Sequence, residues 1–60
     1  MYQVRDVLTD EVISAATQLR ALGDTMSEHL LCYACKADGS QLTEVEANEL
    51  AYWTRDAIWN

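Results

Sequence analysis

The last third of the chain carries the clearest pattern of apolar and polar positions. Thr43 and Glu46 match the S/T-x-x-E capping box, which predicts that a helix begins there and runs over 44–59. One side of this helix is apolar and rich in small side chains, so it predicts a core face that another helix can approach closely. The positions on this side are Ala47, Leu50, Ala51, Thr54, Ala57 and Ile58.

The same helix carries a second apolar stripe, roughly opposite the first. Val45, Tyr52 and Trp59 recur every seven residues along it. A helix needs only one apolar side in order to fold, and a second one indicates contact with a partner. This stripe is therefore the strongest functional signal in the sequence, and it points to binding.

Apolar spacing also predicts helices in the first two thirds of the chain. From Val4 to Leu22 the apolar positions follow a 4-4-3-4-3 spacing, which predicts a helix over 3–22. Met26, Leu30, Tyr33 and Ala37 form the stripe of a second helix, over 26–37.

Glycine positions support this division. Gly23 and Gly39 fall where the periodicity breaks, and glycine commonly ends helices. Val and Ile do not alternate with polar residues over a useful length, so no strand is expected. The predicted fold is all-α, a small three-helix bundle forming a single domain over 1–60.

The short length of the chain favours self-association. Sixty residues bury a small fraction of their surface, eight of them are alanine and there is no phenylalanine. We therefore expect tight packing through alanine, homodimerisation that completes the bundle, or both. As the alternative to target binding, Val45, Tyr52 and Trp59 form the dimer seam.

Charge restricts the class of partner. Ten acidic residues against four basic ones give a net charge of −6, which disfavours direct nucleic-acid binding because phosphate contacts need lysine and arginine. An acidic surface suits a protein target with a basic surface, although the same charge can simply keep a small protein soluble. The first 25 residues show no signal peptide and no run is apolar enough to span a membrane, so we expect a cytoplasmic protein.

Cys32 and Cys35 form a C-x-x-C, with His29 three residues before them. Placed inside the predicted second helix, this motif lacks the helix start that lowers a thiol pKa in redox proteins. Three side chains on one helix also fall short of the four ligands of a structural zinc site. We therefore predict no metal, no cofactor and no enzyme activity, and two reduced cysteines.

An acidic cluster of Asp38, Glu44, Glu46 and Glu49 spans twelve residues that contain no lysine or arginine. It reads either as a solvated turn with the first turn of a helix, or as a patch that occupies a basic groove on another protein. Aromatic residues beside charge are typical of interface hot spots and favour the second interpretation. The predicted partner-binding residues are Glu44, Glu46, Glu49, Tyr52, Asp56 and Trp59.

In size, in the acidic cluster and in the surface formed by Tyr52, Trp53 and Trp59, the chain resembles the small acidic helical inhibitors that phages encode, including anti-CRISPR proteins. These proteins share no diagnostic motif, so the resemblance assigns no role to an individual residue. It implies a protein in the host cytoplasm that binds a nucleic-acid-handling complex, such as a CRISPR-Cas effector, and denies it its DNA. The alternative is a homodimeric helical adaptor or regulator that does not block DNA.

Overall fold

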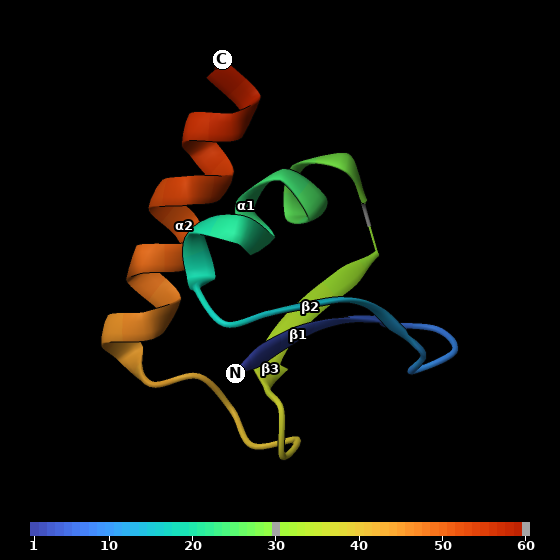
Figure 1. Cartoon of the computed structure of the whole chain (residues 1–60). Helices are drawn as coiled ribbons and strands as arrows, with labels where there is room; N and C mark the ends of the chain where they lie inside the picture. The colour runs from blue at the N-terminus through green and yellow to red at the C-terminus, as the bar shows by residue number, and fades with distance from the viewer. Residues whose placement is uncertain (30, 60) are drawn as a thin grey trace.

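The computed structural model describes residues 1–29 and 31–59, and over them the chain adopts an α+β fold (Figure 1). The elements follow in the order β1 (Tyr2–Asp6), β2 (Val12–Ala16), α1 (Leu19–Glu28), β3 (Cys32–Lys36) and α2 (Glu44–Trp59). The prediction of an all-α three-helix bundle is therefore wrong. The range 3–22 holds two strands and the start of α1, and 26–37 holds the end of α1 and β3.

The three strands form one antiparallel sheet in the order β2-β1-β3. Tyr2 of the central strand pairs with Ala16 of β2 and with Lys36 of β3. Side chains alternate between the two faces of a strand, so Tyr2 and Val4 share one face. Val4 is fully buried on this face against α1, which places the hydrophobic core between the sheet and the helices.

The helical spacing in the first segment is coincidental, since two of its apolar residues lie near the surface loop between β1 and β2. Leu8 is 78 % exposed and Val12 is 51 % exposed. The Oδ1 atom of Asp6 accepts hydrogen bonds from the backbone N–H groups of Leu8, at 2.7 Å, and Thr9, at 3.0 Å, which turns the chain. Asp10 then adopts a left-handed conformation at φ 61°, which asparagine and aspartate tolerate better than most residues.

Gly23 lies in the middle of α1 and does not end a helix as predicted. A Cβ atom at this position would lie 2.7 Å from the backbone oxygen of Trp53 on α2. Glycine is therefore needed because the two helices cross in close contact. Gly39 does occupy a turn, with φ 88°, in the connection from β3 to α2.

The core is small and centres on α1. Leu19 and Leu22 of α1 are buried with Val4 of β1 and Leu50 of α2. Figure 1 shows α2 beside α1, with the sheet below α1 in this view, and α2 makes most of its contacts with α1. This arrangement leaves α2 only partly covered, so both of its flanks remain open for binding.

Candidate functional site

The start of α2 is fixed by Glu46. The backbone N–H of Thr43 donates to Oε1 of Glu46 at 3.0 Å, and the N–H of Glu46 donates to Oγ1 of Thr43 at 3.2 Å, as the capping box predicts. The hydroxyl of Tyr2 donates to Oε2 of Glu46 at 2.6 Å, and the ammonium of Lys36 lies 3.5 Å from Oε1. One carboxylate thus joins α2 to β1 and β3.

These contacts hold Glu46 in its ionised form. The hydrogen bonds from Tyr2 and from the backbone of Thr43, together with the charge of Lys36, lower the pKa of Glu46 to about 2. The same hydrogen bond to Glu46 is the main reason that the pKa of Tyr2 is raised, and burial and the nearby charge of Glu49 add to it. Glu46 is therefore a fixed negative charge at neutral pH.

Aromatic side chains lie further along the same flank of α2. The Tyr52 and Trp53 rings meet edge to face, with centroids 4.9 Å apart and planes at 84°. The guanidinium carbon of Arg20 on α1 lies 4.8 Å from the centre of the Trp53 ring, which is a cation–π geometry.

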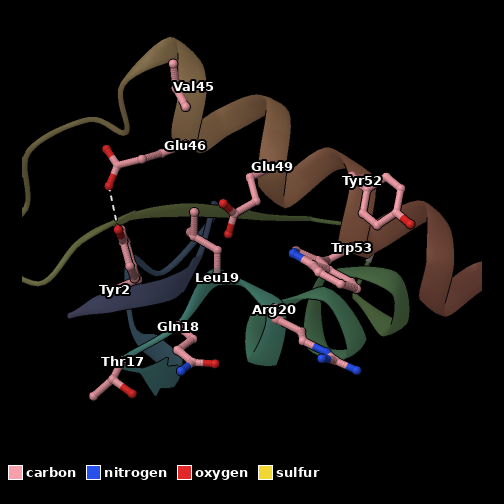
Figure 2. A pocket seen from close by; sticks show the side chains of 10 residues that line it. All are labelled: Tyr2, Thr17, Gln18, Leu19, Arg20, Val45, Glu46, Glu49, Tyr52 and Trp53. Atoms are coloured by element: carbon pink, nitrogen blue, oxygen red, sulfur yellow. Dashed lines mark hydrogen bonds between the residues drawn. The ribbon is translucent and has the colours of Figure 1, made fainter.

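These residues line an open groove of about 590 Å³ between α2 and the start of α1, shown in Figure 2. This volume falls within the range of roughly 300–1,000 Å³ that is usual for ligand sites. We call this site the acidic–aromatic groove. It is lined by Tyr2, Thr17, Gln18, Leu19, Arg20, Val45, Glu46, Glu49, Tyr52 and Trp53.

Glu49 is the carboxylate of this groove that remains available. Figure 2 shows its side chain leaving α2 between Glu46 and Trp53 and entering the groove. Within residues 1–29 and 31–59, Glu49 makes no side-chain hydrogen bond or ion pair, whereas Glu46 is held by three partners. A cation entering the groove would therefore meet the charge of Glu49 first.

The groove collects only part of the residue set predicted from the sequence. Glu46, Glu49 and Tyr52 line it, as does Val45 of the predicted dimer seam. The remaining predicted residues are on α2 but do not line the groove; they are Glu44, Asp56 and Trp59.

The sequence reasoning missed the wall of the groove that faces α2. The predicted helix over 3–22 contains the stretch from Thr17 to Arg20, and Tyr2 precedes it, so the sequence does not place these residues opposite α2. The alternation of Tyr2 and Val4 with Gln3 and Arg5 was a usable strand signal for β1. Nothing in the sequence indicated that Arg20 would meet Trp53.

The C-x-x-C motif lies on β3 and not inside a helix. Residues three apart on a strand point to opposite faces, so Cys32 and Cys35 do not form one site. Burial raises the pKa of the Cys32 thiol, and the nearby charge of Asp6 adds to this effect, which opposes thiolate chemistry. No group of three metal-ligating side chains occurs among the described residues, and the predicted stripe of His29, Cys32 and Cys35 on one helix is wrong.

The acidic–aromatic groove can bind a cation through Glu49 and aromatic faces, and it has the size of a ligand site. None of the helices in the described part of the chain has the length and apolar character needed to cross a membrane. Function has to be argued from the side chains themselves, because no protein-family model, curated protein sequence or solved structure matches this chain.

Proposed function

We propose that this protein is a small acidic binding protein that captures a basic segment of a larger protein target in the acidic–aromatic groove. The observation that carries the proposal is the Arg20 guanidinium over the Trp53 ring, in the same groove as the carboxylate of Glu49, which has no partner among the described residues. The protein's own arginine shows that this ring accepts a guanidinium. An arginine of a target would compete with Arg20 for this aromatic surface, and the carboxylate of Glu49 lines the same groove.

The charge of the whole molecule supports a basic target. The net charge is −6, and the groove contains two carboxylates and one guanidinium. Acidic surfaces speed association with basic partners, and aromatic anchors lengthen the lifetime of the complex. Glu44 and Asp56, which lie on α2 outside the groove, would act through the first effect.

Proteins that handle nucleic acids present lysine and arginine where the phosphate backbone lies, so they form the target class that we propose. By occupying such a surface this protein would inhibit the target, as an anti-CRISPR protein does to a CRISPR-Cas effector. That role places it in the cytoplasm that contains the target. It requires neither a cofactor nor direct contact with DNA.

A titration with an arginine-rich peptide tests the groove before a target is known. Binding is followed through tryptophan fluorescence, since Trp53 lies in the groove, and through chemical shifts of the groove residues. Glu49→Lys should weaken binding severalfold, up to about thirtyfold, because it removes one attraction and adds one repulsion of roughly 0.2–1 kcal/mol each. The matched control is Glu44→Lys, which changes the net charge equally outside the groove.

The two variants separate a groove from general electrostatics. A larger loss for Glu49→Lys than for Glu44→Lys supports the proposal. Equal losses that follow net charge alone, without shifts at Tyr52 and Trp53, would show that the acidic–aromatic groove is not the binding site.

A second candidate function is a homodimeric adaptor or regulator. Val45, Tyr52 and Trp59 are 77 %, 59 % and 82 % exposed, which is unusual for three large apolar residues on one helix. Two copies could bury these stripes against each other. This role competes with target binding at Val45 and Tyr52, which belong both to the stripe and to the groove.

A further inference from the structure

Strand β3 forms an open edge of the sheet, and the hydrogen bonds beyond its ends fix the direction of its backbone groups. The N–H of Ala37 donates to the carbonyl of Met1 at 3.0 Å, and the N–H of Val7 donates to the carbonyl of Leu31 at 2.9 Å. Bonded pairs alternate along an antiparallel ladder. With the observed register, the peptide groups of Cys32, Ala34 and Lys36 therefore point away from β1.

Only part of this edge is covered. The turn after β3 covers the groups of Lys36, whose N–H donates to the carbonyl of Ser40 at 2.9 Å and whose carbonyl accepts from Gly39 at 2.9 Å. The outward groups of Cys32 and Ala34 have no backbone partner among residues 1–29 and 31–59. Such an edge is a template for another strand.

A groove of about 450 Å³ runs beside this edge, on the flank of α2 away from the acidic–aromatic groove. One wall is Ala34 of β3 with Met26 of α1, and the other is α2 from Ala47 to Ile58. We call it the apolar groove, because Arg55 is the one charged residue among its lining residues.

We propose that an extended apolar segment of a partner protein pairs with β3 as an added strand and inserts alternate side chains into the apolar groove. Backbone hydrogen bonds to Cys32 and Ala34 would supply part of the affinity, and the groove would select apolar side chains at every second position. This proposal concerns the opposite flank of α2 and does not depend on the acidic–aromatic groove.

The segment would carry an acidic residue at one end. Lys36 lies 3.5 Å from Glu46, which sets the beginning of α2 beside the end of β3. Arg55 is more than two turns further along α2 than Glu46, and it lines the apolar groove together with Met26. The thiol of Cys32 contacts the sulfur of Met26, another residue of this groove, at 3.6 Å. A carboxylate on the segment would therefore meet Arg55 near Cys32.

A synthetic peptide in which valine alternates with threonine, ending in aspartate, is the probe. Binding should slow hydrogen exchange at the amides of Cys32 and Ala34, measured by NMR on the full chain. A peptide methylated on the backbone nitrogens that would donate hydrogen bonds to β3 should not bind. Ala51→Lys, which places a charge in the groove, should abolish binding, whereas Asn48→Lys on the exposed side of α2 should leave it unchanged.

Arg55→Glu provides a charge-swap test of the orientation. It should weaken binding of the aspartate peptide about two- to thirtyfold, because it removes one attraction and adds one repulsion, and binding should recover when the peptide ends in lysine. Glu49→Lys, in the other groove, should leave this peptide's affinity within about twofold. The failure of one proposal is thus distinguishable from the failure of the other.

Four results would overturn the added strand. The first is saturable binding of the peptide that leaves the amides of Cys32 and Ala34 unprotected. The second is equal binding of the methylated peptide. The third is binding of decanoate that excludes the peptide without protecting these amides, which would indicate a pocket for small apolar carboxylates. The fourth is protection of both amides in the free protein that rises with its concentration, which would show that a second copy of this chain covers the edge.

Discussion

Gly23 of α1 lies directly against the backbone of Trp53 on α2, so that a Cβ atom on residue 23 would stand 2.7 Å from the Trp53 oxygen and 2.8 Å from its carbonyl carbon. Both atoms belong to the backbone of a helix and cannot move aside as a flexible side chain would. This contact sets the spacing of the two helices and, with it, the position of Trp53 in the acidic–aromatic groove.

Gly23→Ala should destabilise the protein by about 1–3 kcal/mol, the usual cost of overpacking, even though alanine favours helix more than glycine does. Chemical denaturation of the variant and of Ala21→Ser, an exposed change on the same helix, measures the difference. A variant as stable as the wild type would show that α1 and α2 are not in close contact.

The Tyr2–Glu46 hydrogen bond predicts loss of stability in acid. The pKa of Glu46 is lowered from 4.5 to about 2 in the folded protein, so its ionised form stabilises the fold above pH 4.5 and this contribution is lost as pH falls toward 2. Lowered pKa values of Asp6 and Asp38, caused by hydrogen bonds from their own turns, act in the same direction. Thermal unfolding midpoints should therefore fall over this range.

Glu46→Gln and Tyr2→Phe isolate the contribution of this bond. Both variants should start from a lower midpoint at neutral pH and lose less of it on acidification. Tyr2 also has a raised pKa, so its contribution is present below its ordinary pKa of 10.0 and is lost as the pH rises through the higher folded value. Identical acid profiles in wild type and Glu46→Gln would contradict the role given to this carboxylate.

The helix over 44–59 could be predicted from the sequence because its signals are local. The capping box of Thr43 and Glu46 acts within one turn, and the helix begins at Glu44 as the pattern indicates. Its two apolar sides were also predicted, but the side of Ala47 and Leu50 was expected to be a core face, and it lines the apolar groove with Ala47 exposed. Val45 and Tyr52, of the second side, line the acidic–aromatic groove. Which partner elements would face them depends on the first two thirds of the chain, where the prediction failed.

The prediction of helices in the first two thirds of the chain failed because the strands there are only five residues long. A strand of this length offers only two or three apolar positions, which also fit a helical spacing when a loop residue such as Leu8 is included. The sequence predicts a helix end at Gly23 because it does not show that the backbone of Trp53 lies against this residue. The partners of the groove, Tyr2 and Arg20, depend on these tertiary contacts and could not be found without them.

Cys32 and Cys35 should not form a disulfide with each other when the protein is oxidised. Residues three apart on a strand are about 10 Å apart, and a disulfide requires Cα atoms within about 7 Å. Mass spectrometry after mild oxidation and alkylation should show no internal bond in the monomer, and purified protein should contain no stoichiometric zinc. A Cys32–Cys35 disulfide would require β3 to unfold and would contradict its strand assignment.

Arg20→Ala should strengthen binding of an arginine-rich peptide to the acidic–aromatic groove. The substitution exposes the face of Trp53 and removes a positive charge that repels the ligand. A cation–π contact at an exposed site contributes about 0.5–1 kcal/mol, so affinity should rise about two- to fivefold. Arg55→Ala is the matched control, because it changes the net charge equally on the other flank of α2.

Comparison of the two arginine variants locates the effect. An equal gain for both would show that net charge alone governs binding. A loss of affinity in Arg20→Ala would contradict this prediction and show that Arg20 holds Trp53 in its binding position. Glu49→Lys would then be the remaining test of binding in the acidic–aromatic groove.

The exposed stripe on α2 predicts self-association that depends on Trp59. This side chain is 82 % exposed, beyond the acidic–aromatic groove, and with Val45 and Tyr52 it offers apolar surface that a 60-residue chain has not buried. Sedimentation should show a 6.8 kDa species at low concentration and a dimer at micromolar concentration. Trp59→Ala should weaken the dimer by about 2 kcal/mol or more, roughly thirtyfold, as expected for an aromatic anchor.

Leu8→Ala is the control, since Leu8 is 78 % exposed on the distant loop between β1 and β2. If Leu8→Ala dissociates the dimer and Trp59→Ala does not, the contact lies at that loop and the stripe on α2 is free for the target. If the unmodified protein does not dimerise at any concentration, the exposed stripe is a target surface only. Trp59→Ala should then speed dissociation of the target complex.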